Sequence, residues 1–259
     1  MISLGTPTAY ASGGEAYCLR VKTDAGRETT VHVAKHEVET TSVEVALLDP
    51  PQPLQVWAGS RSISEAVNGG FFTKPELLPL GELAVAGKAG AHRPFVEPWS
   101  AVRGTLCVRD GRIAIGPRDE FQLGACEALL QAGPLLVQGG RPVVDDDDPE
   151  GFSSTCEEFD SDISDGPYPR VAVGISSRCI VAVSADGRSE RDDGLTLVEL
   201  AHLLAELGAE AALNLDGGSS SSLIAGGIRR NQPRDDEGTL LEDGYPTATA
   251  LVFHGPRAR

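Results

Sequence analysis

The chain has 259 residues, of which 41% are apolar and 23% charged, and its 38 acidic and 22 basic side chains give a net charge of −16. A chain of this length can bury enough apolar surface to hold a core without disulfides or metals. The acidic balance excludes a stable grip on nucleic acid, which requires clustered Lys and Arg side chains. No stretch of about 18 apolar residues is present, so we expect no membrane span.

The N-terminus has no basic segment followed by a continuous apolar stretch, which is typical of an unexported, cytoplasmic protein. Five cysteines are widely spaced and odd in number: Cys18, Cys107, Cys126, Cys156 and Cys179. Because no CxxC pair is present, we expect buried free thiols in a reducing compartment rather than a disulfide framework.

Short alternating segments rich in β-branched residues dominate the first half of the chain and predict strands. These predicted strands cover residues 16–21, 29–34, 43–48 and 83–86. A hairpin is predicted over residues 106–116, because Asp110-Gly111 is a pair that tolerates positive φ in a type I′ turn. A second hairpin is centred on Gly139-Gly140, and residues 170–175 and 179–184 predict a further strand pair.

The segment TLVELAHLLAELG predicts the one long helix. Thr196 and Glu199 have the spacing of a capping box, and Gly208 stands where a glycine ends a helix. Many strands with one long and a few short helices indicate an α+β fold built from mixed, mostly antiparallel sheets. We expect a single domain over residues 1–259, with residues 1–55 as a possible β-rich subdomain.

Three segments place polar side chains beside glycines where predicted strands end or begin. They are AVNGGFF with Asn68, Gly69 and Gly70; PRVAVG with Arg170; and LNLDGGSSSS with Asn214, Asp216, Gly217, Gly218 and Ser219. A carboxylate at the end of a buried strand is a typical catalytic placement, and Arg suits phosphate or carboxylate recognition. Each segment alone is also an ordinary turn sequence.

In order along the chain, NGGFF, the DGR hairpin, GPLLVQGG, PRVAVG, ADGRSERDDG, LNLDGGSSSSL and TATALVFH resemble the phosphodiester glycosidase family. The resemblance covers residues 60–254. It implies a hydrolase that cleaves the bond between a sugar anomeric carbon and a phosphodiester, releasing free sugar and a phosphomonoester. The substrate would be a small molecule or glycan carrying a sugar 1-phosphodiester, and no cofactor or metal is implied.

Within this resemblance, we hypothesise that Asp216 is the catalytic carboxylate, as general base or nucleophile, and that Arg170 holds the phosphate at the catalytic site, with Arg188 as a second candidate. Substrate-binding roles are assigned to residues that can donate hydrogen bonds or admit a close approach: Asn68, Gly69, Gly70, Asn214, Gly217, Gly218 and Ser219. Asp186 is a candidate second carboxylate, although its ADGR context is equally a turn.

Two departures from the family pattern leave alternatives open. The family's LDGGGS reads LDGGSS here, with Ser219 in place of the third glycine, and Tyr245 lies where an Arg often precedes the last strand. A sugar-binding or nucleotide-sugar-binding module without catalysis therefore remains an alternative, as does a glycosidase acting on a linkage without phosphate. The acidic segment at residues 160–166 lacks the glycine and closing Glu of an EF-hand, so that motif is rejected.

Overall fold

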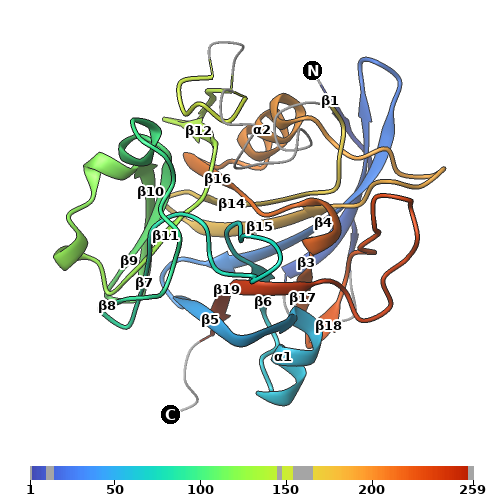
Figure 1. Ribbon diagram of the computed structural model, residues 1–259. Coiled ribbons are helices and arrows are strands. Elements are labelled where there is room, and N and C mark those ends of the chain that lie inside the picture. The colour runs from blue at the N-terminus through green and yellow to red at the C-terminus, as the bar shows by residue number, and fades with distance from the viewer. Residues whose placement is uncertain (1, 10–14, 145–147, 154–165, 256–259) are drawn as a thin grey trace.

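The computed structural model of the protein describes residues 2–9, 15–144, 148–153 and 166–255. Within these ranges the chain forms three β-sheets and two α-helices (Figure 1). Every ladder between the described strands is antiparallel, which confirms the mostly antiparallel architecture. The fold is dominated by strands, because the two helices have only seven and ten residues. The helix content is therefore smaller than the α+β fold predicted from the sequence implies.

The largest sheet has nine strands in the order β1-β3-β4-β15-β14-β16-β12-β13, with β2 paired to β3. Its strands are β1 (Ile2–Leu4), β2 (Thr8–Ala9), β3 (Glu15–Thr23), β4 (Glu28–Glu37), β12 (Leu135–Gln138), β13 (Arg141–Pro142), β14 (Arg170–Ile175), β15 (Cys179–Ala185) and β16 (Ala211–Leu215).

Two five-stranded sheets complete the fold, in the orders β10-β9-β11-β7-β8 and β18-β17-β6-β19-β5. The first contains β7 (Leu83–Val85), β8 (Lys88–Ala89), β9 (Gly104–Arg109), β10 (Arg112–Pro117) and β11 (Ala128–Gln131). The second contains β5 (Ser42–Pro53), β6 (Ala66–Asn68), β17 (Leu223–Ala225), β18 (Ile228–Arg229) and β19 (Pro246–His254). Four single turns of 3-10 helix lie at Trp99–Ala101, Arg118–Glu120, Leu123–Ala125 and Gly218–Ser220.

Both hairpins predicted from their turn residues are present. Asp110 and Gly111 have φ angles of 51° and 70°, and Gly139 and Gly140 have φ angles of 55° and 75°. Two consecutive left-handed residues are what a type I′ turn requires, because its twist then matches the right-handed twist of the strands. The strand pair β14–β15 also lies where the sequence predicts it.

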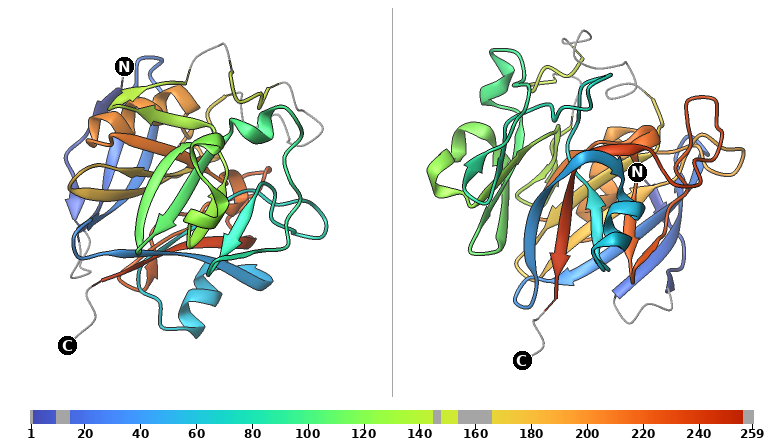
Figure 2. Two further views of the ribbon diagram at one scale, coloured as in Figure 1. Left: turned by 90° about the vertical axis from the view of Figure 1, so that its left-hand side faces the viewer. Right: turned by 60° about the horizontal axis from the view of Figure 1, so that its bottom comes forward.

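The central strands of the large sheet are buried on both faces. Along β14, Val171 and Val173 belong to the core shared with the two smaller sheets, whereas Ala172 belongs to the core beneath helix α2 (Leu197–Glu206). Figure 2 shows the large sheet standing between α2 and the smaller sheets. Close packing on both faces holds such a strand rigidly. The residues at its ends, where the packed layers stop, are therefore held in fixed positions.

Helix α2 confirms its sequence signals. The Thr196 hydroxyl accepts from the Glu199 N–H at 3.2 Å, the Glu199 carboxylate accepts from the Thr196 N–H at 2.9 Å, and Gly208 has a φ of 90°. The sequence did not predict α1 (Leu54–Ser60), because it follows Pro53 without any side-chain cap. Its buried Leu54 and Trp57 show that tertiary packing stabilises this short helix.

The strands before residue 55 are built into two sheets together with later strands. β4 pairs with β15, and β5 pairs with β19 along most of its length. The single-domain organisation stays a prediction. No helix in the described ranges is long and apolar enough to cross a membrane.

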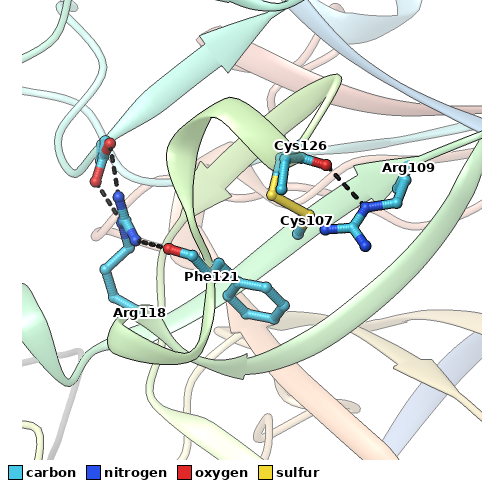
Figure 3. Close-up of a disulfide and its surroundings, with 7 residues drawn as sticks. Cys107, Arg109, Arg118, Phe121 and Cys126 are labelled. Carbon is cyan, nitrogen blue, oxygen red and sulfur yellow. Dashed lines mark hydrogen bonds and ion pairs between the residues drawn. A yellow bond between two sulfur atoms is a disulfide. The ribbon is translucent and has the colours of Figure 1, made fainter.

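One expectation about the cysteines is wrong. Cys107 on β9 and Cys126, just before β11, form a disulfide whose Cα atoms are 5.6 Å apart (Figure 3). The bond lies in a small apolar cluster with Ala84 and Leu129. Cys107 and Cys126 are 19 residues apart, and sequence spacing without a CxxC motif could not reveal that β9 and the segment before β11 bring them together. Cys18 and Cys179 are free, and Cys156 lies outside the described residues.

A disulfide persists mainly in oxidising compartments, so this bond weighs against the cytoplasmic location expected from the sequence. That location stays a prediction.

Removing the disulfide should destabilise the protein measurably. A Cys107→Ser, Cys126→Ser double variant should lose about 3 kcal/mol of unfolding free energy, the loop-closure entropy expected for 19 residues of separation. Urea unfolding with and without reductant measures this loss. Cys179→Ser, at a half-buried free thiol, is the matched control and should change stability by less than about 1 kcal/mol. Unfolding of the wild type that is insensitive to reductant would contradict the assignment.

Candidate active site

The end of β16 and the start of β14 meet at one edge of the large sheet. Val171 pairs with Leu215, so Arg170 and Asp216 occupy neighbouring positions at that edge. The N–H of Asp216 donates to the carbonyl of Gly69 at 3.0 Å, and Gly69 directly follows β6 of a different sheet. The structure thus brings the three glycine-bearing segments together at a seam between two sheets.

Asn68 links the two sheets at this seam through hydrogen bonds. Its side chain is fully buried, and its Nδ2 donates to the backbone carbonyl of Asp216 at 2.7 Å. Its Oδ1 accepts from the N–H of Ser222 at 2.8 Å. The amide predicted to bind sugar hydroxyls therefore has both ends engaged in positioning the turn that carries Asp216. Its role in substrate binding stays a prediction.

The glycines of the site are required by backbone packing. A Cβ on Gly69 would lie 2.4 Å from the Thr249 Oγ1, and a Cβ on Gly217 would lie 2.6 Å from the carbonyl oxygen of Pro169. The N–H groups of Gly70 and Gly218 donate to Thr249 Oγ1 and to the Pro169 carbonyl. These contacts explain the NGG and DGG sequences, since a larger residue would push residue 69 away from β19 or residue 217 away from the segment before β14.

Asp216 is half-buried at the end of β16, and both its backbone N–H and its carbonyl are held by the neighbouring segment at residues 68–69. Because these bonds use only the backbone, they fix the main chain from which the carboxylate extends, without depending on its charge. A catalytic role for this carboxylate stays a prediction.

Arg170 is almost completely buried, with 3% of its surface exposed. Its Nε donates to the carbonyl of Leu195 at 3.0 Å and its Nη2 to the carbonyl of Gly166 at 3.1 Å. These bonds tie the segments on either side of the site to the start of β14. A direct contact between Arg170 and phosphate stays a prediction.

Arg188 reaches the DGGSS turn from the loop after β15. Its Nη1 donates to the hydroxyl of Ser219 at 3.1 Å and to the carbonyl of Arg234 at 3.1 Å. Its Nη2 pairs with the Asp236 carboxylate at 2.6 Å. The departure from the family's LDGGGS thus has a structural consequence, because Ser219 supplies a hydroxyl that a glycine lacks. Arg188 also has a φ of 59°, which is rare for a residue other than glycine.

A polar pocket of about 650 Å³ opens beside Arg188. Asp186 lies in its lining, where the carboxylate bonds to the His32 Nε2 at 2.8 Å and accepts from the N–H of Gln232 at 2.7 Å. Thr30 and Arg234 line the same space. Asp186 is 6% exposed and well anchored, so it shapes the pocket wall.

Asn214 points away from this pocket, toward the interior. Its Nδ2 donates to the carbonyl of Gly133 at 3.0 Å, and its Oδ1 accepts no hydrogen bond from the described residues although the side chain is 2% exposed. The predicted contact between Asn214 and sugar hydroxyls stays a prediction.

Sequence reasoning missed two neighbours of the site. His32 is one of them, and its partnership with Asp186 depends on the pairing of β4 with β15. The Tyr168 ring lies near both arginines, with its centroid 5.5 Å from the guanidinium of Arg170 and 5.8 Å from that of Arg188. The YPR sequence offered a weak signal for the tyrosine, whereas nothing local pointed to His32.

A second missed group lies behind the site. Arg103 is completely buried, with the rings of Phe95 and Phe152 centred 4.3 and 4.4 Å from its guanidinium carbon. The carboxylate of Glu150 accepts from the N–H groups of Leu135 at 2.6 Å and Gly104 at 2.5 Å. Burial raises the pKa of Glu150 to about 7, against the lowering effect of these bonds and of Arg103.

Among the residues that the structure describes, no group of three or more His, Cys, Asp or Glu side chains is arranged to hold a metal. Residues 160–165 of the rejected calcium motif lie outside the described ranges.

The family model described as phosphodiester glycosidase matches residues 61–254, about three quarters of the chain. The chain belongs to the phosphodiester glycosidase family. The N-acetylglucosamine-1-phosphodiester alpha-N-acetylglucosaminidase of Bos taurus is 26% identical over 208 residues, covering 75% of this chain and 37% of that protein. The Mus musculus protein of the same name is 26% identical over 205 residues, covering 75% and 38%. This chain thus spans less than two fifths of the length of these relatives.

Solved structures share the fold. The catalytic domain of the zebrafish N-acetylglucosamine-1-phosphodiester alpha-N-acetylglucosaminidase, described as auto-inhibited by its pro-peptide, aligns with a TM-score of 0.69 at 18% identity, covering 98% of this chain and 87% of that one. A hypothetical protein from Synechocystis aligns with a TM-score of 0.62 at 19% identity, covering 93% and 62%. The fold assigned from the family resemblance is confirmed by these alignments.

Proposed function

We propose that this protein hydrolyses the bond between the anomeric carbon of a sugar and a phosphodiester, with Asp216 as the catalytic carboxylate and Arg188 as the phosphate ligand. The observation that carries the proposal is the hydrogen bond from Arg188 to Ser219, three residues after Asp216. It joins a cation suited to phosphate and a pre-positioned carboxylate in one rigid turn. Membership of the family and the names of the relatives support the same reaction.

The chemistry suits this pair of residues. In the reaction, water adds to the anomeric carbon while the bond from that carbon to the phosphate oxygen breaks, giving free sugar, a phosphomonoester and one proton. A phosphate leaving group carries its charge stably, so protonation by a strong general acid is less necessary than for an alkyl glycoside. The protein must instead hold the phosphate and stabilise positive charge at the sugar, which are the tasks of Arg188 and Asp216.

A pair of aromatic rings provides a surface for the sugar. Phe72 and Tyr245 stack with an interplanar angle of 9° and a centroid separation of 6.3 Å, and both side chains are half-buried. Phe72 follows Gly70 by two residues, and Tyr245 immediately precedes β19, which holds the backbone of Gly69. The apolar C–H faces of sugar rings pack well on such aromatic surfaces. Tyr245 would thus replace the family's Arg with a contact to the sugar.

The reaction is tested with a panel of sugar 1-phosphodiesters, including UDP-N-acetylglucosamine, and matched glycosides without phosphate. Release of reducing sugar should depend on the phosphate. Arg188→Met should lower kcat/KM on the phosphodiesters by about 10- to 100-fold, because a hydrogen-bonded charge is lost, and should leave the binding of neutral glycosides unchanged. Tight binding without turnover would favour a binding module, and equal cleavage of both panels would favour a glycosidase indifferent to phosphate.

A further inference from the structure

The guanidinium of Arg188 has two kinds of partner. Nη1 is held by the Ser219 hydroxyl and the Arg234 carbonyl, both part of the frame of the site. Nη2 is held by the carboxylate of Asp236, whose side chain is 80% exposed, whereas the Arg188 side chain is only 11% exposed. The charge of the nearly buried Arg188 guanidinium is therefore balanced on its Nη2 side by the solvent-exposed carboxylate of Asp236.

The loop that carries Asp236 does not depend on this ion pair. Asp235 stabilises the turn itself, since its Oδ1 accepts from the N–H groups of Glu237 at 3.0 Å and Thr239 at 2.7 Å. Arg234 donates to the carbonyl of Gly238 at 2.8 Å. The Asp236 side chain can therefore rotate away from Arg188 while the turn stays intact.

An ion pair with such an exposed partner contributes little to folding, about 1 kcal/mol or less. Its position matters more, because Arg188 lines the pocket beside the DGGSS turn and a phosphate bound to its Nη2 would occupy the place of the Asp236 carboxylate. Two anions cannot both pair closely with the same nitrogen without repulsion.

We propose that Asp236 is an exchangeable counter-ion that occupies the phosphate position on Arg188 and is displaced when an anionic substrate binds. The inference rests on the proposed function for the identity of the substrate, and it adds a residue that determines selectivity. The negative charge of a phosphodiester forms a new ion pair with Arg188, which offsets the loss of the pair with Asp236. A neutral glycoside leaves the Arg188–Asp236 pair in place and gains no binding energy from Arg188.

The test compares Asp236→Asn with Glu237→Gln in the full chain. Both variants remove one negative charge from adjacent exposed residues, but only Asp236 pairs with Arg188, while Glu237 lines the same pocket. Inorganic phosphate is titrated by calorimetry at an ionic strength of about 0.15 M, where charges without direct contact are largely screened. Asp236→Asn should bind phosphate about three- to fivefold more tightly than wild type, the fold-change that corresponds to an exposed ion pair of up to about 1 kcal/mol. Glu237→Gln should change the affinity by less than about 1.5-fold.

A double variant shows whether the gain acts through Arg188. In an Arg188→Met background, Asp236→Asn should no longer increase the affinity for phosphate, because the competition has been removed. Equal gains in Asp236→Asn and Glu237→Gln would overturn the proposal, as would a gain that persists without Arg188 or the absence of measurable phosphate binding in all variants.

Calorimetry keeps this inference separate from the reaction. Failure of the wild type to cleave any phosphodiester, together with the expected phosphate affinities, would reject the hydrolase and support the counter-ion. Cleavage of a phosphodiester, together with equal phosphate affinities of Asp236→Asn and Glu237→Gln, would support the hydrolase and reject the counter-ion. If cleavage occurs, Asp236→Asn should lower KM for phosphodiesters without lowering kcat, and should leave a neutral glycoside unaffected.

Discussion

Asp216→Asn is expected to lower kcat for a sugar 1-phosphodiester by about a thousandfold, the range over which a positioned carboxylate contributes to acid–base catalysis. The substitution keeps the shape of the side chain and removes its negative charge. Folding should be preserved, because the Asp216 N–H and carbonyl make the bonds to Gly69 and Asn68 through the backbone alone. Binding of the substrate should change little, so KM should stay within a few fold of wild type.

Steady-state release of reducing sugar measures this loss, and thermal unfolding verifies that the variant is folded. Asp119→Asn, an exposed carboxylate in the turn after β10, is the matched control and should retain full activity. Turnover that survives in Asp216→Asn would remove Asp216 from the chemistry. If turnover is lost, proton NMR of the first-formed anomer in the wild type then distinguishes retention from inversion, which the sequence alone could not decide.

The strands and turns were predictable where local chemistry determines them. Asp110-Gly111 and Gly139-Gly140 specify their hairpins because few other residues accept two left-handed conformations in succession. Helix α2 was predictable for a similar reason, since Thr196, Glu199 and Gly208 cap it locally. The order of the strands in three sheets was not predictable, because pairings such as β4 with β15 join segments more than a hundred residues apart.

The same distinction applies to the site. Asn68, Asp216 and the glycines beside them could be selected from the sequence, because a polar residue followed by two glycines at a strand end is a local pattern. Their contacts could not be predicted from the sequence, since Asn68 and Gly69 contact segments that lie about 150 or more residues away along the chain. The structure adds that Asn68 and Gly69 join the end of β6 to the end of β16 in another sheet, and their predicted contacts with substrate stay predictions.

Arg188 and Asp186 illustrate an intermediate case. The sequence interprets the ADGR motif either as a turn or as a source of site residues. In the structure it is an irregular segment after β15, in which Arg188 has a φ of 59°, and its role in binding stays a prediction. Asp186 is anchored to His32 and Gln232 in the pocket wall, while Arg188 extends to Ser219. The partners of each side chain come from β4, from the DGGSS turn and from the loop at residues 232–238, so no single segment could reveal them.

The Arg103–Glu150 group should give the fold a dependence on pH that can be isolated by mutation. Burial raises the pKa of Glu150 from 4.5 to about 7, so the folded protein holds a proton that the unfolded chain releases. This contribution is fully present below pH 4.5 and is lost as the pH rises toward 7. Glu150→Gln does not titrate, so the wild-type advantage over this variant should shrink by about 2.5 kcal/mol between pH 5 and pH 8.

Arg103→Met should show the opposite dependence on pH. Without the guanidinium, the Glu150 carboxylate is left buried and uncompensated when it ionises, which costs about 3–5 kcal/mol. The deficit relative to wild type should therefore be largest at pH 8 and smaller at pH 5, where the carboxyl group is protonated. The Met side chain retains an apolar contact between the rings of Phe95 and Phe152, so the variant can still pack.

Urea unfolding of the three proteins at pH 5, 6, 7 and 8 gives the two differences, and Glu206→Gln, on the exposed side of α2, should give a difference that is flat with pH. Differences of opposite slope identify Glu150 as the titrating group and Arg103 as its electrostatic partner. Parallel or flat differences would show instead that the pair contributes only packing. Gly133 lies between Glu150 and Asn214, so a loosened pair should also disturb β16, which Asp216 follows. The loss of activity in Arg103→Met should therefore grow with pH as its stability falls.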